Sequence, residues 1–317
     1  MLSSTDLQKI DAVEQAMATM DTELLQLKKD YLANDQVIDA TEQKHLDELE
    51  GQIRALFSKL QQAKAALPPE ITLEQYHSKT YHKVNYIPPV KISMFDVSLD
   101  PQTGIMDVVC KVKFVFKQHR RGKMEKNKDN PAYQWTPAEE KKWKDEFIHL
   151  ATERWSGKFS FVHPDLAGVR VSVRVKVVEA NSGWHFETEV LKSPKHGRSF
   201  VQYPEEAHKQ HPEALKVTLH SKDLEEHAVE GESHEHHVGV HEQGHMLAGL
   251  DDQYAYGDDG MIKHNVLVRN ALGVVLDVEY TGDDLMAVGN QVRQHDYVGY
   301  WQALRDVTGL IKWKFER

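Results

Sequence analysis

Residues 241–245 read His241-Glu242-Gln243-Gly244-His245, and they indicate the fold of this chain more specifically than any other stretch. On an α-helix, residues four positions apart share a face, so the imidazoles of His241 and His245 can reach one metal ion. Glu242 stands beside them, where a carboxylate can take a proton from a water molecule bound to that ion. The pattern therefore predicts a helix that presents a zinc site together with a general base.

The flanking residues predict that this helix is buried and that it ends at Gly249. Apolar side chains surround the motif: Val238, Val240, Met246 and Leu247. Glycine readily adopts the left-handed conformation that ends many helices. A chain that turns back there can bring a third ligand to the metal, as a catalytic zinc site with three protein ligands and one open position requires.

The longer segment 241–254 resembles the HExxHxxxGLxDEY segment of IgA-peptidase-like bacterial zincins, which are metzincin-like zinc metallopeptidases. Gln253 stands where that segment usually has glutamate. The resemblance implies a zincin-like fold, Zn²⁺ as the cofactor and hydrolysis of peptide bonds. Asp252 falls on the aspartate of the segment, which implies that Asp252 is the third zinc ligand.

Two neighbouring aspartates compete for this third position. In the metzincin pattern HExxHxxGxxH the third ligand follows the turn glycine by three positions, and that count from Gly249 reaches Asp252. The count from His241 reaches Asp251 instead. We favour Asp252, because the turn should matter more than the count along the helix. Solvation of the helix end is the alternative for both, and His237 is another candidate ligand, in a cluster with His234 and His236 that is more typical of an exposed polar stretch.

A second segment, Asp283-Asp284-Leu285-Met286, is similar to the Met-turn of metzincin-like enzymes. This similarity implies that Met286 forms a hydrophobic floor beneath the metal ligands, although a methionine at this place could equally be ordinary core. Tyr297 is the candidate donor to the oxyanion of the transition state, with His295 as the other choice. The alternative for Tyr297 is packing of a C-terminal helix.

The rest of the chain predicts an α+β protein with a helical hairpin at its front. Apolar stripes at helical spacing place the hairpin in residues 1–67, and Asp39 with Glu42 forms a capping box for its second helix. Residues 68–89 are rich in Pro, Tyr and His and are expected to be a linker. Residues 90–317 form the zincin-like domain with a mixed sheet, comprising a strand-rich front part (90–134) and a core (135–317).

Several elements of that domain can be predicted from local patterns. Thr136-Pro137-Ala138-Glu139 is typical of a helix start. Strands are expected at 90–99, 105–116, 158–162, 170–178 and 215–219. The single cysteine, Cys110, lies within the second of these strands and is expected to be buried rather than nucleophilic.

Composition excludes some classes of function. The 317 residues carry a net charge of -10, which disfavours nucleic-acid binding because that depends on Lys and Arg. No apolar run approaches the ~20 residues of a membrane span. The N-terminus lacks the pattern of an ordinary signal peptide, so cytoplasmic synthesis is expected, with export left to a dedicated system.

These observations favour a zinc metalloendopeptidase that acts on protein or peptide substrates. An effector or toxin delivered by a secretion or contractile injection apparatus fits the combination of protease domain and N-terminal hairpin, with residues 1–67 as the contact to that apparatus. The alternative is a non-catalytic metal-binding structural or adaptor protein. Substrate, cleavage preference and oligomeric state do not follow from the sequence.

Overall fold

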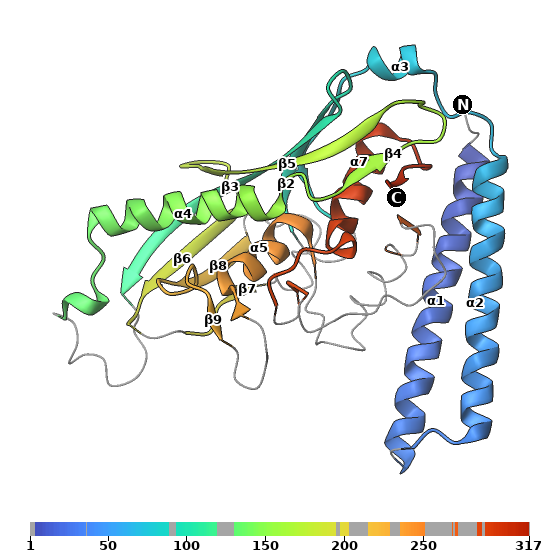
Figure 1. Ribbon diagram of the computed structural model, residues 1–317, viewed down its shortest axis with the longest axis horizontal. Helices are drawn as coiled ribbons and strands as arrows, with labels where there is room; N and C mark the ends of the chain where they lie inside the picture. The colour runs from blue at the N-terminus through green and yellow to red at the C-terminus, as the bar shows by residue number, and fades with distance from the viewer. Residues whose placement is uncertain are drawn as a thin grey trace.

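The computed structural model describes residues 4–35, 37–88, 93–118, 130–194, 197–202, 215–228, 235–250, 268, 270–271, 284–286 and 289–316. It is an α+β structure in which a mixed sheet carries helices on one face, with a long helical hairpin beside it (Figure 1). None of the helices in these ranges is long and apolar enough to cross a membrane.

The hairpin consists of α1 (Ser4–Asp35) and α2 (Ala40–Ala66). The predicted capping box is present: the Asp39 carboxylate accepts from the backbone N–H of Glu42, and the Glu42 side chain accepts from the backbone N–H of Asp39. Two apolar clusters join the helices, and one of them also contacts Ile311 near the C-terminus. The hairpin therefore packs against the end of the chain, as Figure 1 shows.

Residues 68–89 differ from the expected linker. They contain α3 (Leu73–His77) and β1 (Tyr81–Tyr86), and β1 pairs antiparallel with β2 (Phe95–Asp100). Tyr76, Tyr81 and Tyr86 are at most 3% exposed and belong to the main core. The composition is misleading here because the prolines lie only at the two ends of the segment, whereas its tyrosines are large apolar rings that the core buries.

Within the described residues the sheet has nine strands, with the order β11-β4-β5-β3-β6-β8-β7 along the main path and β1 and β2 at the side of β3. The long strand β3 (Ile105–Gln118) is central: β5 (Arg170–Glu179) and β6 (Phe186–Lys192) both pair parallel with it, and β8 (Leu215–His220) pairs parallel with β6. Antiparallel strands complete the sheet: β4 (Ser160–Val162), β7 (Phe200–Gln202) and β11 (Lys314–Phe315).

One face of this sheet is covered by α4 (Pro137–Trp155), α5 (Val238–Ala248) and α7 (Val298–Thr308). Alternate side chains of β3 point into that layer, where the ring of Phe114 lies 5.7 Å from the ring of Phe147. The other side chains of β3 form ion pairs with neighbouring strands, such as Lys113 with Glu187 at 2.8 Å. Period-two alternation in the strands thus separates a helix-covered core from a charged face.

Most of the locally predicted elements are confirmed. The Thr136 capping box opens α4, and Cys110 is fully buried in β3. The strands at 105–116, 158–162, 170–178 and 215–219 correspond to β3, β4, β5 and β8, and the expected strand at 90–99 begins at Phe95 in the described residues.

Other elements were not predicted from the sequence. The pattern missed β6 and β7, and α5 is preceded by a small ribbon of β9 (His227–Ala228) and β10 (Glu235–His236). The turns η2 (Pro131–Tyr133) and η4 (Gln294–Tyr297) are short 3-10 helices.

Candidate metal centre

The helix α5 carries the His-Glu-x-x-His motif and is enclosed by other elements. Every residue from Gly239 to Ala248 is buried. The Gln243 side chain donates to the carbonyl of Phe147 in α4 at 3.0 Å, which fixes one side of the helix. As predicted, α5 ends at Gly249, which has a left-handed φ of 64°. The motif is therefore held on a rigid, short helix rather than on a loop.

His241 and His245 share one face of α5, as the spacing predicts. Their ring centroids are 5.0 Å apart, and each residue is 5% exposed. The Nδ1 atom of His241 lies 2.9 Å from the carbonyl oxygen of Leu285, and Nδ1 of His245 lies 2.8 Å from that of Leu250. A carbonyl oxygen only accepts, so each Nδ1 carries the proton, and in a neutral ring Nε2 then holds the lone pair.

This tautomer fits a metal ligand. Histidines that bind metals almost always donate their second ring N–H to a carbonyl, a carboxylate or water, which fixes the orientation of the ring. Here two different chain segments supply the carbonyls: the turn after α5 and the segment around Leu285. The two imidazoles could therefore offer Nε2 to one ion such as zinc.

The segment 284–286 lies directly against the middle of α5. A Cβ atom added to Gly244 would stand 2.2 Å from the sulfur of Met286, so the absence of a side chain at position 244 makes room for this methionine. Met286 is 1% exposed. Met286 therefore packs against α5 at Gly244, which lies between the two histidines in the chain. Its role as a floor beneath the ligands stays a prediction.

Glu242 is 6% exposed and follows His241 directly on α5. A second carboxyl group lies close enough to influence it electrostatically. Burial and, to a smaller extent, the Glu242 carboxylate together raise the pKa of Asp223 to about 7, in spite of hydrogen bonds from Ser199 and from the backbone of His220. The carbonyl of Asp223 also accepts from the N–H of Gly239 at the start of α5, at 2.9 Å. No sequence pattern pointed to Asp223, because its position near Glu242 depends on the end of β8 meeting α5.

Tyr297 has a different environment from the one expected of an oxyanion donor. Its hydroxyl donates to the carbonyl of Trp155 at the end of α4 and accepts from the N–H of Lys158 at 3.2 Å. The side chain is fully buried, and burial raises the pKa of the hydroxyl. These contacts favour the packing role for Tyr297.

His295 also lies inside the protein, beside two buried carboxyl groups. Its Nε2 atom is 3.6 Å from Asp284 and 3.7 Å from Asp296. Burial, with the charge of Arg293, lowers the pKa of His295 to about 4. Burial, with the charge of Asp284, raises the pKa of Asp296 to about 8. This cluster adjoins the segment that touches α5.

The remaining predicted ligands are only partly described. Asp251 and Asp252 lie outside the described residues, as does His234. His237 is buried and forms the N-cap position of α5, one turn before His241. The structure thus brings His241, Glu242, His245 and Met286 together.

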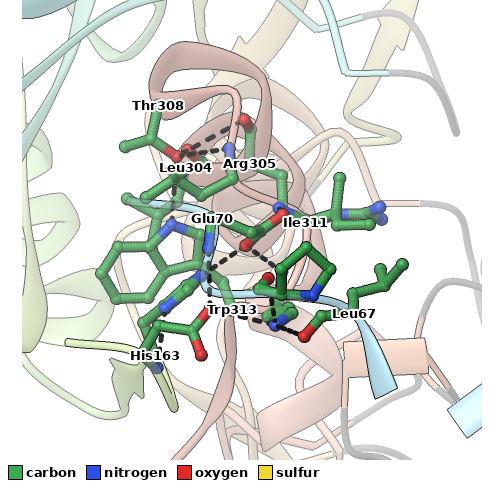
Figure 2. A network of polar contacts seen from close by, with 12 residues as sticks. Leu67, Glu70, His163, Leu304, Arg305, Thr308, Ile311 and Trp313 are labelled. Atoms are coloured by element: carbon green, nitrogen blue, oxygen red, sulfur yellow. Dashed lines mark hydrogen bonds and ion pairs between the residues drawn. The ribbon is translucent and has the colours of Figure 1, made fainter. Parts of the chain in front are cut away.

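A second group of possible ligands, which sequence reasoning missed, lies between the hairpin and the sheet (Figure 2). Glu70, His163 and Asp165 could hold a metal ion, since their ligand atoms all lie within 4.8 Å of one another. These atoms already have partners: His163 Nε2 is 2.6 Å from Glu70, and the N–H of Asp165 donates to His163 Nδ1 at 3.2 Å. The ammonium of Lys312 lies 3.0 Å from Asp165 and already supplies a positive charge there.

Comparison with protein-family models, with curated proteins and with solved structures finds no match to this chain.

Proposed function

We propose that this protein is a zinc-dependent metallopeptidase of zincin-like fold, in which His241 and His245 bind the zinc ion through Nε2. The observation that carries the proposal is the pair of carbonyls that hold both imidazoles by Nδ1, at 2.9 and 2.8 Å. The packing of Met286 against Gly244 supports it. The resemblance of residues 241–254 to IgA-peptidase-like zincins agrees with both observations, and Asp252 is the proposed third ligand, with Asp251 as the alternative.

Zinc, when bound, would polarise the scissile carbonyl and lower the pKa of a water molecule to about 7. Glu242 would accept a proton from the attacking water and pass it to the leaving amine, as a general base and then a general acid. Glu242 follows His241 directly on the buried helix, which supports this role. The substrate would be a protein or a peptide.

The first experiment measures the zinc content of the purified chain beside two variants. We expect one zinc ion per chain in the wild type, loss of zinc in His245→Ala, and retention in His163→Ala, which removes the second group of possible ligands. Loss of zinc from His163→Ala with retention in His245→Ala would show that zinc binds at Glu70, His163 and Asp165 instead, and it would contradict the proposal. Asp252→Ala beside Asp251→Ala then identifies the third ligand.

The general base is tested separately. Glu242→Gln should keep zinc and lower peptide hydrolysis by about 10²–10⁴-fold, the usual contribution of a general base. Hydrolysis at the wild-type rate by a zinc-loaded variant would remove Glu242 from the mechanism.

A non-catalytic metal-binding protein or adaptor is the second candidate. The Glu70, His163 and Asp165 group favours it, because a metal ion held there would join two chain segments, the one after the hairpin and the one after β4. The zinc assay above separates the two candidates. Delivery of an effector or toxin through residues 1–67 stays a prediction from the sequence, and unchanged loading into an injection apparatus after deletion of these residues would contradict it.

A further inference from the structure

Hydrogen bonds and an ion pair hold the segment that contains Asp284 and Leu285, and we call this set of contacts the polar brace. The Asp284 side chain is 1% exposed, and the guanidinium Nε of Arg293 donates to it at 2.9 Å. The N–H of Gly289 donates to the carbonyl of Asp284 at 3.0 Å, and the N–H of Leu285 donates to the carbonyl of Gln291 at 2.9 Å. These backbone hydrogen bonds and the Arg293–Asp284 ion pair therefore hold Asp284 and Leu285 in place.

This brace connects directly to His241. Asp284 is followed by Leu285, whose carbonyl lies 2.9 Å from His241 Nδ1, and then by Met286, which packs against Gly244. Arg293 is itself held in place, because its backbone N–H donates to the buried Asp296 at 2.7 Å. A shift of Asp284 would thus move the carbonyl that orients His241.

From this geometry we propose that the Arg293–Asp284 ion pair positions His241 for the metal by fixing the carbonyl of Leu285. Arg293 is a positioning residue: it acts on the centre through Asp284 and Leu285, and its side chain is 40% exposed. The Arg293 guanidinium offsets the cost of burying the Asp284 carboxylate near Asp296. This inference rests on the proposed zinc site.

The experiment measures the zinc affinity of the full chain by competition with a chelator. Arg293→Met should bind zinc about 10–100-fold more weakly, the effect typical of partners that orient metal ligands. At saturating zinc its peptide hydrolysis should approach the wild-type rate. Arg170→Met is the matched control, because it removes an exposed arginine that pairs with Glu316 at 2.8 Å, and its zinc affinity should equal that of the wild type.

A second variant and a second measurement distinguish the proposed effect from misfolding of Arg293→Met. Asp284→Asn removes the buried charge, so it should fold, and it should also weaken zinc binding. In zinc-free protein, the Nδ1 proton of His241, followed by NMR, should exchange faster with water in both variants. Wild-type zinc affinity and exchange in a folded variant would overturn the inference, whereas a wild type that binds no zinc would overturn the proposed function itself.

Discussion

At the scale of single residues, Gly244 decides whether Met286 can reach the helix that carries the motif. The position of a Cβ atom on Gly244 is 2.2 Å from the Met286 sulfur and 3.1 Å from a ring carbon of Trp155. The sequence motif leaves this position open to any residue, so the need for glycine arises from the close approach of Met286 and not from the helix.

Gly244→Ala should destabilise the protein by about 1–3 kcal/mol, the usual cost of overpacking a core. Met286→Ala removes the atom that the new methyl group would meet, so the double variant should lose less than the sum of the two single changes, by about 1 kcal/mol. Chemical denaturation of the zinc-free chain measures all three values.

The matched control is Gly51→Ala in α2, where a Cβ atom would meet nothing within 4 Å. It should stabilise the chain by about 0.5–1 kcal/mol, because alanine is the better helix former. Additive effects of the changes at positions 244 and 286 would show that Met286 does not pack as described.

At the scale of elements, the Tyr297 hydroxyl ties the start of α7 to the end of α4. It joins the carbonyl of Trp155 to the N–H of Lys158, and the ring lies 5.2 Å from that of Phe159. A sequence pattern could place an aromatic residue near the Met-turn, but only the tertiary contacts with Trp155 and Lys158 determine which way its hydroxyl points.

Tyr297→Phe should destabilise the protein by about 1–2 kcal/mol, since two buried backbone groups lose a partner. Zinc content and the rate of peptide hydrolysis should stay at wild-type levels. Tyr31→Phe is the control: that hydroxyl contacts His45 in the hairpin at an exposed place, and its loss should have little effect. A fall in hydrolysis of about 10²–10³-fold with unchanged stability would restore Tyr297 as an oxyanion donor.

At the scale of the whole molecule, Glu70 joins the segment after the hairpin, the β4 end of the sheet and the C-terminal segment (Figure 2). It accepts from the N–H groups of Ile311 at 2.9 Å and Lys312 at 3.2 Å, and lies 2.6 Å from His163. Lys312 in turn donates to the carbonyls of Leu67 at 3.0 Å and Pro68 at 3.1 Å. This network attaches the hairpin to the rest of the chain.

Glu70→Gln should destabilise the protein by about 2 kcal/mol at neutral pH, because the amide cannot accept from all of these donors. Burial by itself would raise the pKa of Glu70, but the hydrogen bonds from His163, Ile311 and Lys312 hold it below its ordinary 4.5. A lowered pKa in the folded state stabilises the fold above the unfolded value, and this contribution is lost as the pH falls through the folded pKa.

The difference in thermal stability between Glu70→Gln and the wild type should therefore shrink below pH 4.5. Glu50→Gln is the control in the hairpin, where Glu50 forms a partly exposed pair with Lys28 at 3.1 Å, and it should change stability by less than about 1 kcal/mol. A pH-independent difference for Glu70→Gln would show that its carboxylate does not carry this network.

Local spacing was enough to predict what depends on neighbours in the chain. The four-residue step from His241 to His245, the left-handed end at Gly249, and the capping boxes at Asp39 and Thr136 all follow from backbone geometry over a single turn. The apolar run that predicts β3 and the alternation that predicts β5 are equally local, and both strands appear where they were predicted.

The tertiary structure alone decided what joins distant parts of the chain. It places the carbonyl of Leu285 beside His241 and brings Asp223 near Glu242. In place of the expected linker it has β1 and a tyrosine-rich part of the core. Such contacts carry no local signal, because a carbonyl belongs to every residue and a carboxylate acquires its role only from the groups that surround it.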